Sequence, residues 1–245
     1  MSPPPWLVQV RAVLADGRDP ATAAAWARRI DGALERLGGQ VPFRVVYAWH
    51  ARIVRAAPAV PAIQRLGCCY TRALTGDRVT THQWRAALRP VLRGLYRASY
   101  PYAQARQAGH ANALAYANAN GYRPDEAAEF ADYYADLSTA ANARAYAEAS
   151  AIANAEALAA ALAGADAAGY AATYPGALVR AYVLAQVHGD EATDPIPATQ
   201  RAYGRLADAL AASLADGWLP GGSAGPPPRP LPAHVNRPGP IDPAR

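Results

Sequence analysis

The sequence predicts an all-α fold, an Ala-rich bundle of about nine helices followed by an extended Pro/Gly-rich C-terminal tail. Alanine, the strongest helix former, recurs along most of the chain. Proline, Asp or Thr stands where helices are expected to begin, and glycine stands where they are expected to end. Only residues 41–47 have β character, and this short stretch contains a proline, so it is interpreted as the approach to a helix.

Proline and glycine divide the chain into its expected helices. The first helix is expected over Trp6–Ala15, and the second lies between Asp19-Pro20 and Gly38-Gly39. Pro90 lies inside one expected helix, which it should kink or divide. The other helices are expected over Phe43–Ala57, Ile63–Leu74, Thr80 or Thr81 to Tyr96, Pro101–Asn120, Pro175–Gly189 and Pro195–Ala215.

The longest helical stretch begins at Pro124 and extends toward Gly164 or Thr173, with an interruption expected at Ser138-Thr139. Every odd residue from 141 to 163 is Ala, and residues 111–119 repeat the pattern. A period of two is typical of strands, but this run far exceeds the ~5–6 residues of a strand. On a helix, the pattern leaves small residues on all sides, so we expect neighbouring helices to approach closely on more than one side.

Residues 1–217 are expected to form one all-helical domain, and residues 218–245 form the tail. A subdivision near residues 78–100, between an Arg-rich N-terminal half and an acidic Ala-rich half, stays open. Residues 1–110 hold 16 Arg and 5 acidic residues, whereas residues 111–220 hold 5 Arg and 13 acidic residues. Such an asymmetry indicates either a nucleic-acid partner or two halves that pair with each other.

The composition favours a bacterial, cytoplasmic protein. All 24 basic residues are Arg, and Ala, Gly and Pro are abundant, which is typical of a high-GC genome. Cys68 and Cys69 are adjacent, so they are interpreted as small buried side chains in a reducing compartment. The N-terminus does not resemble a signal peptide, and no run reaches the ~18 apolar residues of a membrane span.

Two charged stripes are the strongest local features. Basic side chains recur every fourth residue at Arg85, Arg89, Arg93 and Arg97. Acidic side chains recur at similar spacing at Asp125, Glu129, Asp132 and Asp136. Like charges one helical turn apart repel, so something should compensate each stripe. Water and salt could screen them, or one stripe could bind a ligand; we hypothesise that the two stripes pair across a helix hairpin.

Each stripe also suggests a ligand. The acidic stripe is the weak candidate metal site, because carboxylates at helical spacing can hold Mg²⁺ and a diphosphate substrate. No second metal motif accompanies it, and no Glu-x-x-His pair exists for a di-iron site. The basic stripe, assigned here to interaction, could attract phosphate or nucleic acid, although no nucleic-acid-binding motif is present. His110 is the weak candidate catalytic residue, since Asn112 and Tyr116 flank it.

These patterns lead us to expect a non-enzymatic helical interaction or self-assembly protein, a scaffold or adaptor held by close Ala packing and complementary charge. Its 14 Tyr suit interfaces, and its tail could serve as a peptide ligand. The expected partner is a protein, above all a second copy, and neither nucleic acid nor membrane. No cofactor is expected. One alternative is a helical-bundle enzyme or ligand-binding protein using Mg²⁺ at the acidic stripe, and another is a nucleic-acid-associated regulator acting through the Arg-rich half.

Overall fold

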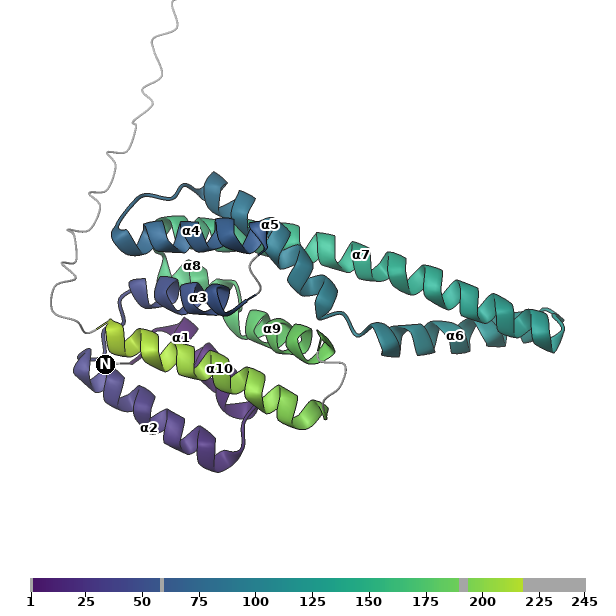
Figure 1. Ribbon diagram of the computed structural model, residues 1–245, viewed down its shortest axis with the longest axis horizontal. Coiled ribbons are helices and arrows are strands. Elements are labelled where there is room, and N and C mark those ends of the chain that lie inside the picture. Colours follow the sequence, from purple (N-terminus) through teal and green to yellow (C-terminus); the bar gives the residue numbers. More distant parts are fainter. Residues whose placement is uncertain (1, 58–59, 190–193, 218–245) are drawn as a thin grey trace, which may run out of the picture.

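The computed structural model describes residues 2–57, 60–189 and 194–217. These residues form ten α-helices and no strand, which confirms the predicted all-α fold (Figure 1). The helices are α1 (Pro5–Asp16), α2 (Pro20–Arg36), α3 (Arg44–Ala56), α4 (Pro61–Thr75), α5 (Thr81–Ala98), α6 (Tyr102–Ala119), α7 (Pro124–Gly164), α8 (Ala167–Ala172), α9 (Pro175–Gly189) and α10 (Pro195–Asp216).

The helix ends follow the start and stop residues of the sequence. The Asp19 carboxylate caps α2 by accepting a hydrogen bond of 2.9 Å from the backbone N–H of Thr22. Thr80 and Gln83 form a reciprocal capping box at the start of α5. Pro90 lies inside α5 without ending it. Local chemistry therefore sets where most of these helices begin.

Two expectations about local structure were wrong, one at Ser138-Thr139 and one at Cys68. Ser138 and Thr139 do not interrupt α7, because Thr139 is itself buried in a helix packing surface. Of the two ends expected for the longest helix, the structure has the one at Gly164, and the short α8 follows it. Cys69 is buried as expected, whereas Cys68 is exposed.

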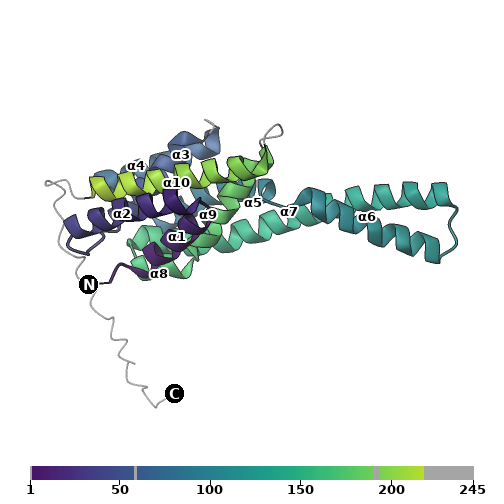
Figure 2. The same ribbon diagram turned by 90° about the horizontal axis from the view of Figure 1, so that it is seen from below.

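The described chain divides into a body and an arm. The arm consists of α6 and the first part of α7, up to residue 141, and it projects from the body as a two-helix hairpin (Figures 1 and 2). Within the described residues, α6 packs against α7 and against no other helix. The body contains the remaining helices and the second part of α7. The domain division predicted near residues 78–100 stays a prediction.

The body has a core of large side chains. Trp6, Trp26, Trp49 and Trp84 are each at most 2% exposed, and leucines of α7 and α10 pack with them. The indole N–H groups of Trp26 and Trp49 donate hydrogen bonds to backbone carbonyls of α10. Large aromatic and aliphatic side chains therefore form the core of the body.

Five body helices form a closed ring. Helix α3 packs against α4, α4 against α5, α5 against α9, α9 against α10, and α10 against α3. In the part of the chain that the structure describes, no helix of this ring packs against one across it. The side chains that point inward therefore surround a common space, with Leu158 of α7 and Tyr170 of α8 also bordering it.

A small-residue seam runs along α7. Every fourth residue from Ala127 to Ala159 is buried, with Thr139 as the one non-alanine member. Because an α-helix repeats every 3.6 residues, such a seam drifts around the helix by about 40° per step. Its first part faces α6 and its later part belongs to the surface packed against α5. In the Ala series at 141–163, alternate members are buried up to Ala159 and the members between them are exposed.

None of the described helices is both long and apolar enough to span a membrane. The predicted tail, residues 218–245, lies outside the described residues.

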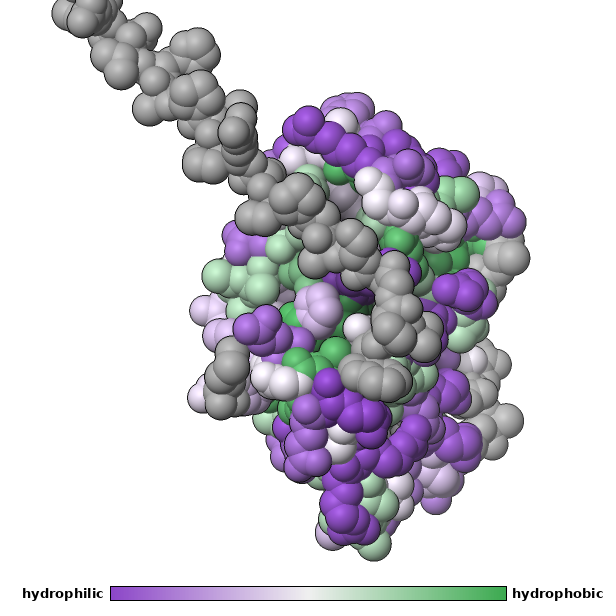
Figure 3. Space-filling model, turned by 90° about the vertical axis from the view of Figure 1, so that its left-hand side faces the viewer, coloured by the Kyte–Doolittle hydropathy of each residue, from purple (hydrophilic) through white to green (hydrophobic). Residues whose placement is uncertain are grey.

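On the end of the body opposite the arm, hydrophilic residues gather in the upper and lower parts, with hydrophobic residues between them (Figure 3).

Candidate interaction surface

The arm carries an exposed aromatic cluster, defined here as Tyr116, Tyr122, Phe130 and Tyr134. Phe130 is its centre, with ring centroids of Tyr116, Tyr122 and Tyr134 at 6.1, 5.6 and 6.0 Å. The three tyrosines are 58%, 42% and 48% exposed, respectively. Two shallow hollows border Phe130, and Tyr134 lines one of them. Aromatic rings therefore lie together on the surface instead of in a core.

The geometry of the hairpin explains this exposure. The two arm helices meet through small residues, including Ala113 and Ala117 of α6 and Ala131 of α7, each at most 4% exposed. Such an interface has no room for rings, so the aromatic side chains lie outside it. No third described helix packs on α6 and could cover them. An uncovered apolar cluster of this kind is typical of an interaction surface.

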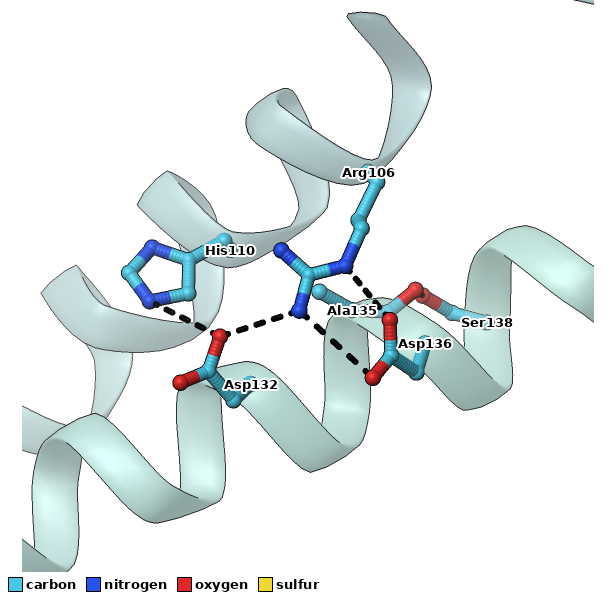
Figure 4. Close-up of polar contacts among 6 residues, drawn as sticks. All are labelled: Arg106, His110, Asp132, Ala135, Asp136 and Ser138. Atoms are coloured by element: carbon cyan, nitrogen blue, oxygen red, sulfur yellow. Dashed lines mark hydrogen bonds and ion pairs between the residues drawn. The ribbon is translucent and has the colours of Figure 1, made fainter. Parts of the chain in front are cut away.

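Ion pairs tie the two arm helices together on another side (Figure 4). The Arg106 guanidinium of α6 donates hydrogen bonds to Asp136 at 2.5 Å and to Asp132 at 3.1 Å. His110 lies 3.6 Å from Asp132, between its Nε2 and the Oδ1 atom of the carboxylate. The hydrogen bond between Arg106 and Asp136 lowers the pKa of Asp136 and raises the pKa of Arg106. These contacts bridge α6 and α7.

The hypothesis that the Arg85–Arg97 and Asp125–Asp136 stripes pair was wrong. Arg85 forms an ion pair with Glu156, and both Arg89 and Arg93 pair with Glu148. Helices α5 and α6 follow one another along α7, so α5 lies against the body part of α7 and the acidic stripe lies against α6.

The glutamates that engage the basic stripe were missed from sequence. Glu148 and Glu156 are eight residues apart, as are Arg85 and Arg93, and this matched spacing was the available signal. Hydrogen bonding from Arg89 is the main cause that lowers the pKa of Glu148. No ion pair of Arg97 is found within the described residues. Three of the four members of the basic stripe are therefore paired with glutamates of α7.

In the described part of the chain, the side chains of the acidic stripe are spread along α7, and its three Asp side chains are paired with arginines. Asp125 and Asp136 lie roughly 16 Å apart along α7, at 1.5 Å per residue, so they cannot share one ion. Asp125 pairs with Arg123 at 2.7 Å, while Asp132 and Asp136 pair with Arg106. No group of three or more His, Cys, Asp or Glu side chains is placed to hold a metal among these residues. Carboxylates neutralised by Arg are poor metal ligands.

His110 lies within this ion-pair group on the arm and is partly exposed (Figure 4). Its 3.6 Å contact with Asp132 is too long for a hydrogen bond. The structure brings His110 together with Asp132 and Arg106. The arrangement fits a bridge between two helices.

Comparison of the chain with protein-family models, curated proteins and solved structures found no match. The geometry and chemistry of the arm and the body are therefore the basis for a proposal about function.

Proposed function

We propose that this protein is a non-enzymatic, self-associating interaction protein, and that its arm contacts the body of a second copy. The observation that carries the proposal is the aromatic cluster around Phe130, which is exposed on a projecting two-helix hairpin. Tyrosine supplies a large contact area with a polar tip, and it is enriched in the centres of protein interfaces. Each arm helix is about 27 Å long or longer, which gives room for an interface of ordinary size.

Charge supports the body as the surface that receives the arm. Residues 102–141 hold two Arg and five acidic residues, a net charge of −3, while the rest of the chain carries +8. Two arms would repel each other, whereas an arm and a body attract. Helix α4 contains no acidic residue and exposes Arg65 and Arg72. No ion pair of these two arginines is found among the described residues, so we place the receiving surface on α4.

The first test is the molar mass of the full chain by light scattering in low and high salt. The monomer is 25.7 kDa. We expect a larger mass at about 0.05 M sodium chloride that falls to the monomer value at about 1 M, because salt screens charges between exposed surfaces. A mass of 25.7 kDa in low salt at all protein concentrations would contradict self-association.

Two variants locate the two surfaces. Tyr116→Ala/Tyr134→Ala removes exposed rings of the arm, and Arg65→Glu/Arg72→Glu reverses the charge of α4. We expect each variant alone to be monomeric, because each lacks one half of the contact. Tyr174→Ala is the matched control, since Tyr174 lies on the body and is 71% exposed. This control should associate like the unchanged protein.

Mixing the two variants distinguishes the proposed contact from one between two arms. A mixture has one intact arm surface and one intact body surface, so it should form a heterodimer that grows no further. If two arms paired instead, the α4 variant alone would still associate and the mixture would add nothing. That result would overturn the arm-to-body contact while keeping self-association.

A further inference from the structure

The ring of body helices encloses a cavity of about 300 Å³. Its wall is made of aliphatic and aromatic side chains from α3, α4, α5, α9 and α10, among them Trp49, Leu66, Leu92 and Val179. An apolar cavity of about 150 Å³ is large enough to take up benzene. This one is about twice as large, within the range of small-molecule sites.

The side chains of His50, Tyr70 and Tyr170 form a polar part of the cavity wall, defined here as its polar end. The Nε2 atom of His50 and the hydroxyl of Tyr170 share a hydrogen bond of 2.7 Å, and the His50 ring stacks on Tyr70 with the ring planes 4° apart. Tyr70 is 2% exposed and borders the cavity. No hydrogen bond of the Tyr70 hydroxyl or of His50 Nδ1 is found within the described residues. Neither atom is among the fully enclosed side-chain atoms without a partner in the described residues, so each keeps some accessible surface at which a ligand can form a hydrogen bond.

The cavity has no charge. None of the residues that line it is Asp, Glu or Arg. Burial lowers the pKa of His50 to about 4, so its imidazole is neutral near pH 7. Burial also raises the pKa of Tyr70 well above its usual value, so its hydroxyl keeps its proton. A charged ligand would lose its hydration here and find no counter-ion.

We propose that this cavity binds an uncharged, mainly apolar small molecule with one hydroxyl or carbonyl group, which meets Tyr70 and His50 at the polar end. The rim is formed in part by Gly94 and Ala98 of α5 and Gln186 of α9. These residues are half-buried or exposed, and they give the ligand a route of entry between α5 and α9.

The test measures the binding of three small probes of nearly equal shape to the full chain by titration calorimetry near neutral pH. 1-Naphthol is uncharged with one hydroxyl, naphthalene lacks the hydroxyl, and 1-naphthoate carries a charge. We expect one saturable site for 1-naphthol, about tenfold weaker binding of naphthalene, and at least a hundredfold weaker binding of 1-naphthoate. The absence of saturable binding by both uncharged probes would overturn the proposal, as would equal binding of the anion.

Two variants assign the binding to the cavity. No atom of another helix lies within 4 Å of the position that a Cβ on Gly94 would take, so Gly94→Phe can add a side chain at the rim without moving the backbone. Gly204 of α10 is equally unobstructed and does not line the cavity, which makes Gly204→Phe the matched control. We expect Gly94→Phe to weaken both uncharged probes at least tenfold and Gly204→Phe to leave them unchanged. Equal binding by the two variants would overturn the assignment.

The variant Tyr70→Phe tests the polar end. It removes only the hydroxyl and keeps the stacked ring. The roughly tenfold preference for 1-naphthol over naphthalene should fall to about onefold, with naphthalene binding unchanged. A preference that survives this change would overturn the role of Tyr70.

Discussion

The body and the arm of this protein bury different kinds of side chain where their helices pack. The body buries tryptophans, leucines and tyrosines between eight helices and part of α7. The arm joins two helices through alanines such as Ala131 and Ala135, which are fully buried, and leaves its aromatic rings outside. Apolar side chains thus stabilise the body from within, whereas in the arm they are left available for another surface.

This difference separates stability from binding. A seam of alanines buries little area, at about 25 cal/mol per Å², so the arm gains less free energy from burial than the body does. It should therefore open locally before the body unfolds. A region with a weak interior and an apolar exterior is suited to gain stability from a partner, which is the basis of the proposed function.

The largest expected effect is the response of the body to acid. His50 is buried and neutral, with its pKa lowered from 6.5 to about 4 by desolvation. Below pH 6.5 the unfolded chain binds a proton that the folded chain does not, so stability is lost as the pH falls from 6.5 to 4. The loss should be roughly 3 kcal/mol, and urea unfolding followed by tryptophan fluorescence measures it.

The variant His50→Gln is the control for this response, because it cannot take up the proton. Its free energy of unfolding should stay nearly constant between pH 6.5 and 5, above the range in which Glu148, whose pKa is lowered from 4.5, loses its contribution. The residues that face His50 are the uncharged rings of Trp49, Tyr70 and Tyr170, so no carboxylate contributes there. In the arm, the pKa of Asp136 is lowered from 3.8, so its contribution is lost only at lower pH. A slope that persists in His50→Gln would contradict this separation.

A smaller effect is expected from overpacking the arm. Ala131 is fully buried at the seam, so Ala131→Leu forces α6 and α7 apart, at a cost of about 1–3 kcal/mol. Amide exchange should become faster in residues 102–119. The midpoint of unfolding by tryptophan fluorescence should not move, because all four tryptophans that the structure describes lie in the body.

The matched control is Ala128→Leu, since Ala128 is exposed on the same helix one turn earlier. It should leave amide exchange in α6 unchanged. If Ala131→Leu lowers the tryptophan midpoint by as much as it speeds exchange, the arm and the body unfold as one unit and the comparison between them fails.

The sequence predicted local structure better than it predicted partners. Caps such as Asp19 and Thr80 act within one turn, so the helix boundaries could be predicted from neighbouring residues. The partner of Arg89 depends on which part of α7 lies beside α5, and no local pattern determines that register. The interruption predicted at Thr139 was wrong for a similar reason, because the burial of this residue on α7 overrides its tendency to interrupt a helix.

The candidate site was predictable only in part. The tyrosine content indicates an interface. The cluster, however, places Tyr116 of α6 and Tyr122 of the hairpin turn beside Phe130 of α7, and this contact depends on how the two helices pack. The cavity could not be foreseen at all. It depends on a ring of five helices in which α9 and α10, late in the sequence, close a gap between α3 and α5.

The smallest expected effect concerns the ion pairs of the arm, and it tests the register directly. Arg106→Glu places a carboxylate against Asp132 and Asp136, so amide exchange in α6 should become faster. Adding Asp136→Arg restores an opposite charge and should recover part of the protection. The pair Arg89→Glu with Asp136→Arg is the control, because Arg89 contacts Glu148 and not Asp136. If the second double variant protected the arm as well as the first, Arg89 would face Asp136 in the folded protein. The packing of α6 against the acidic stripe would then be wrong.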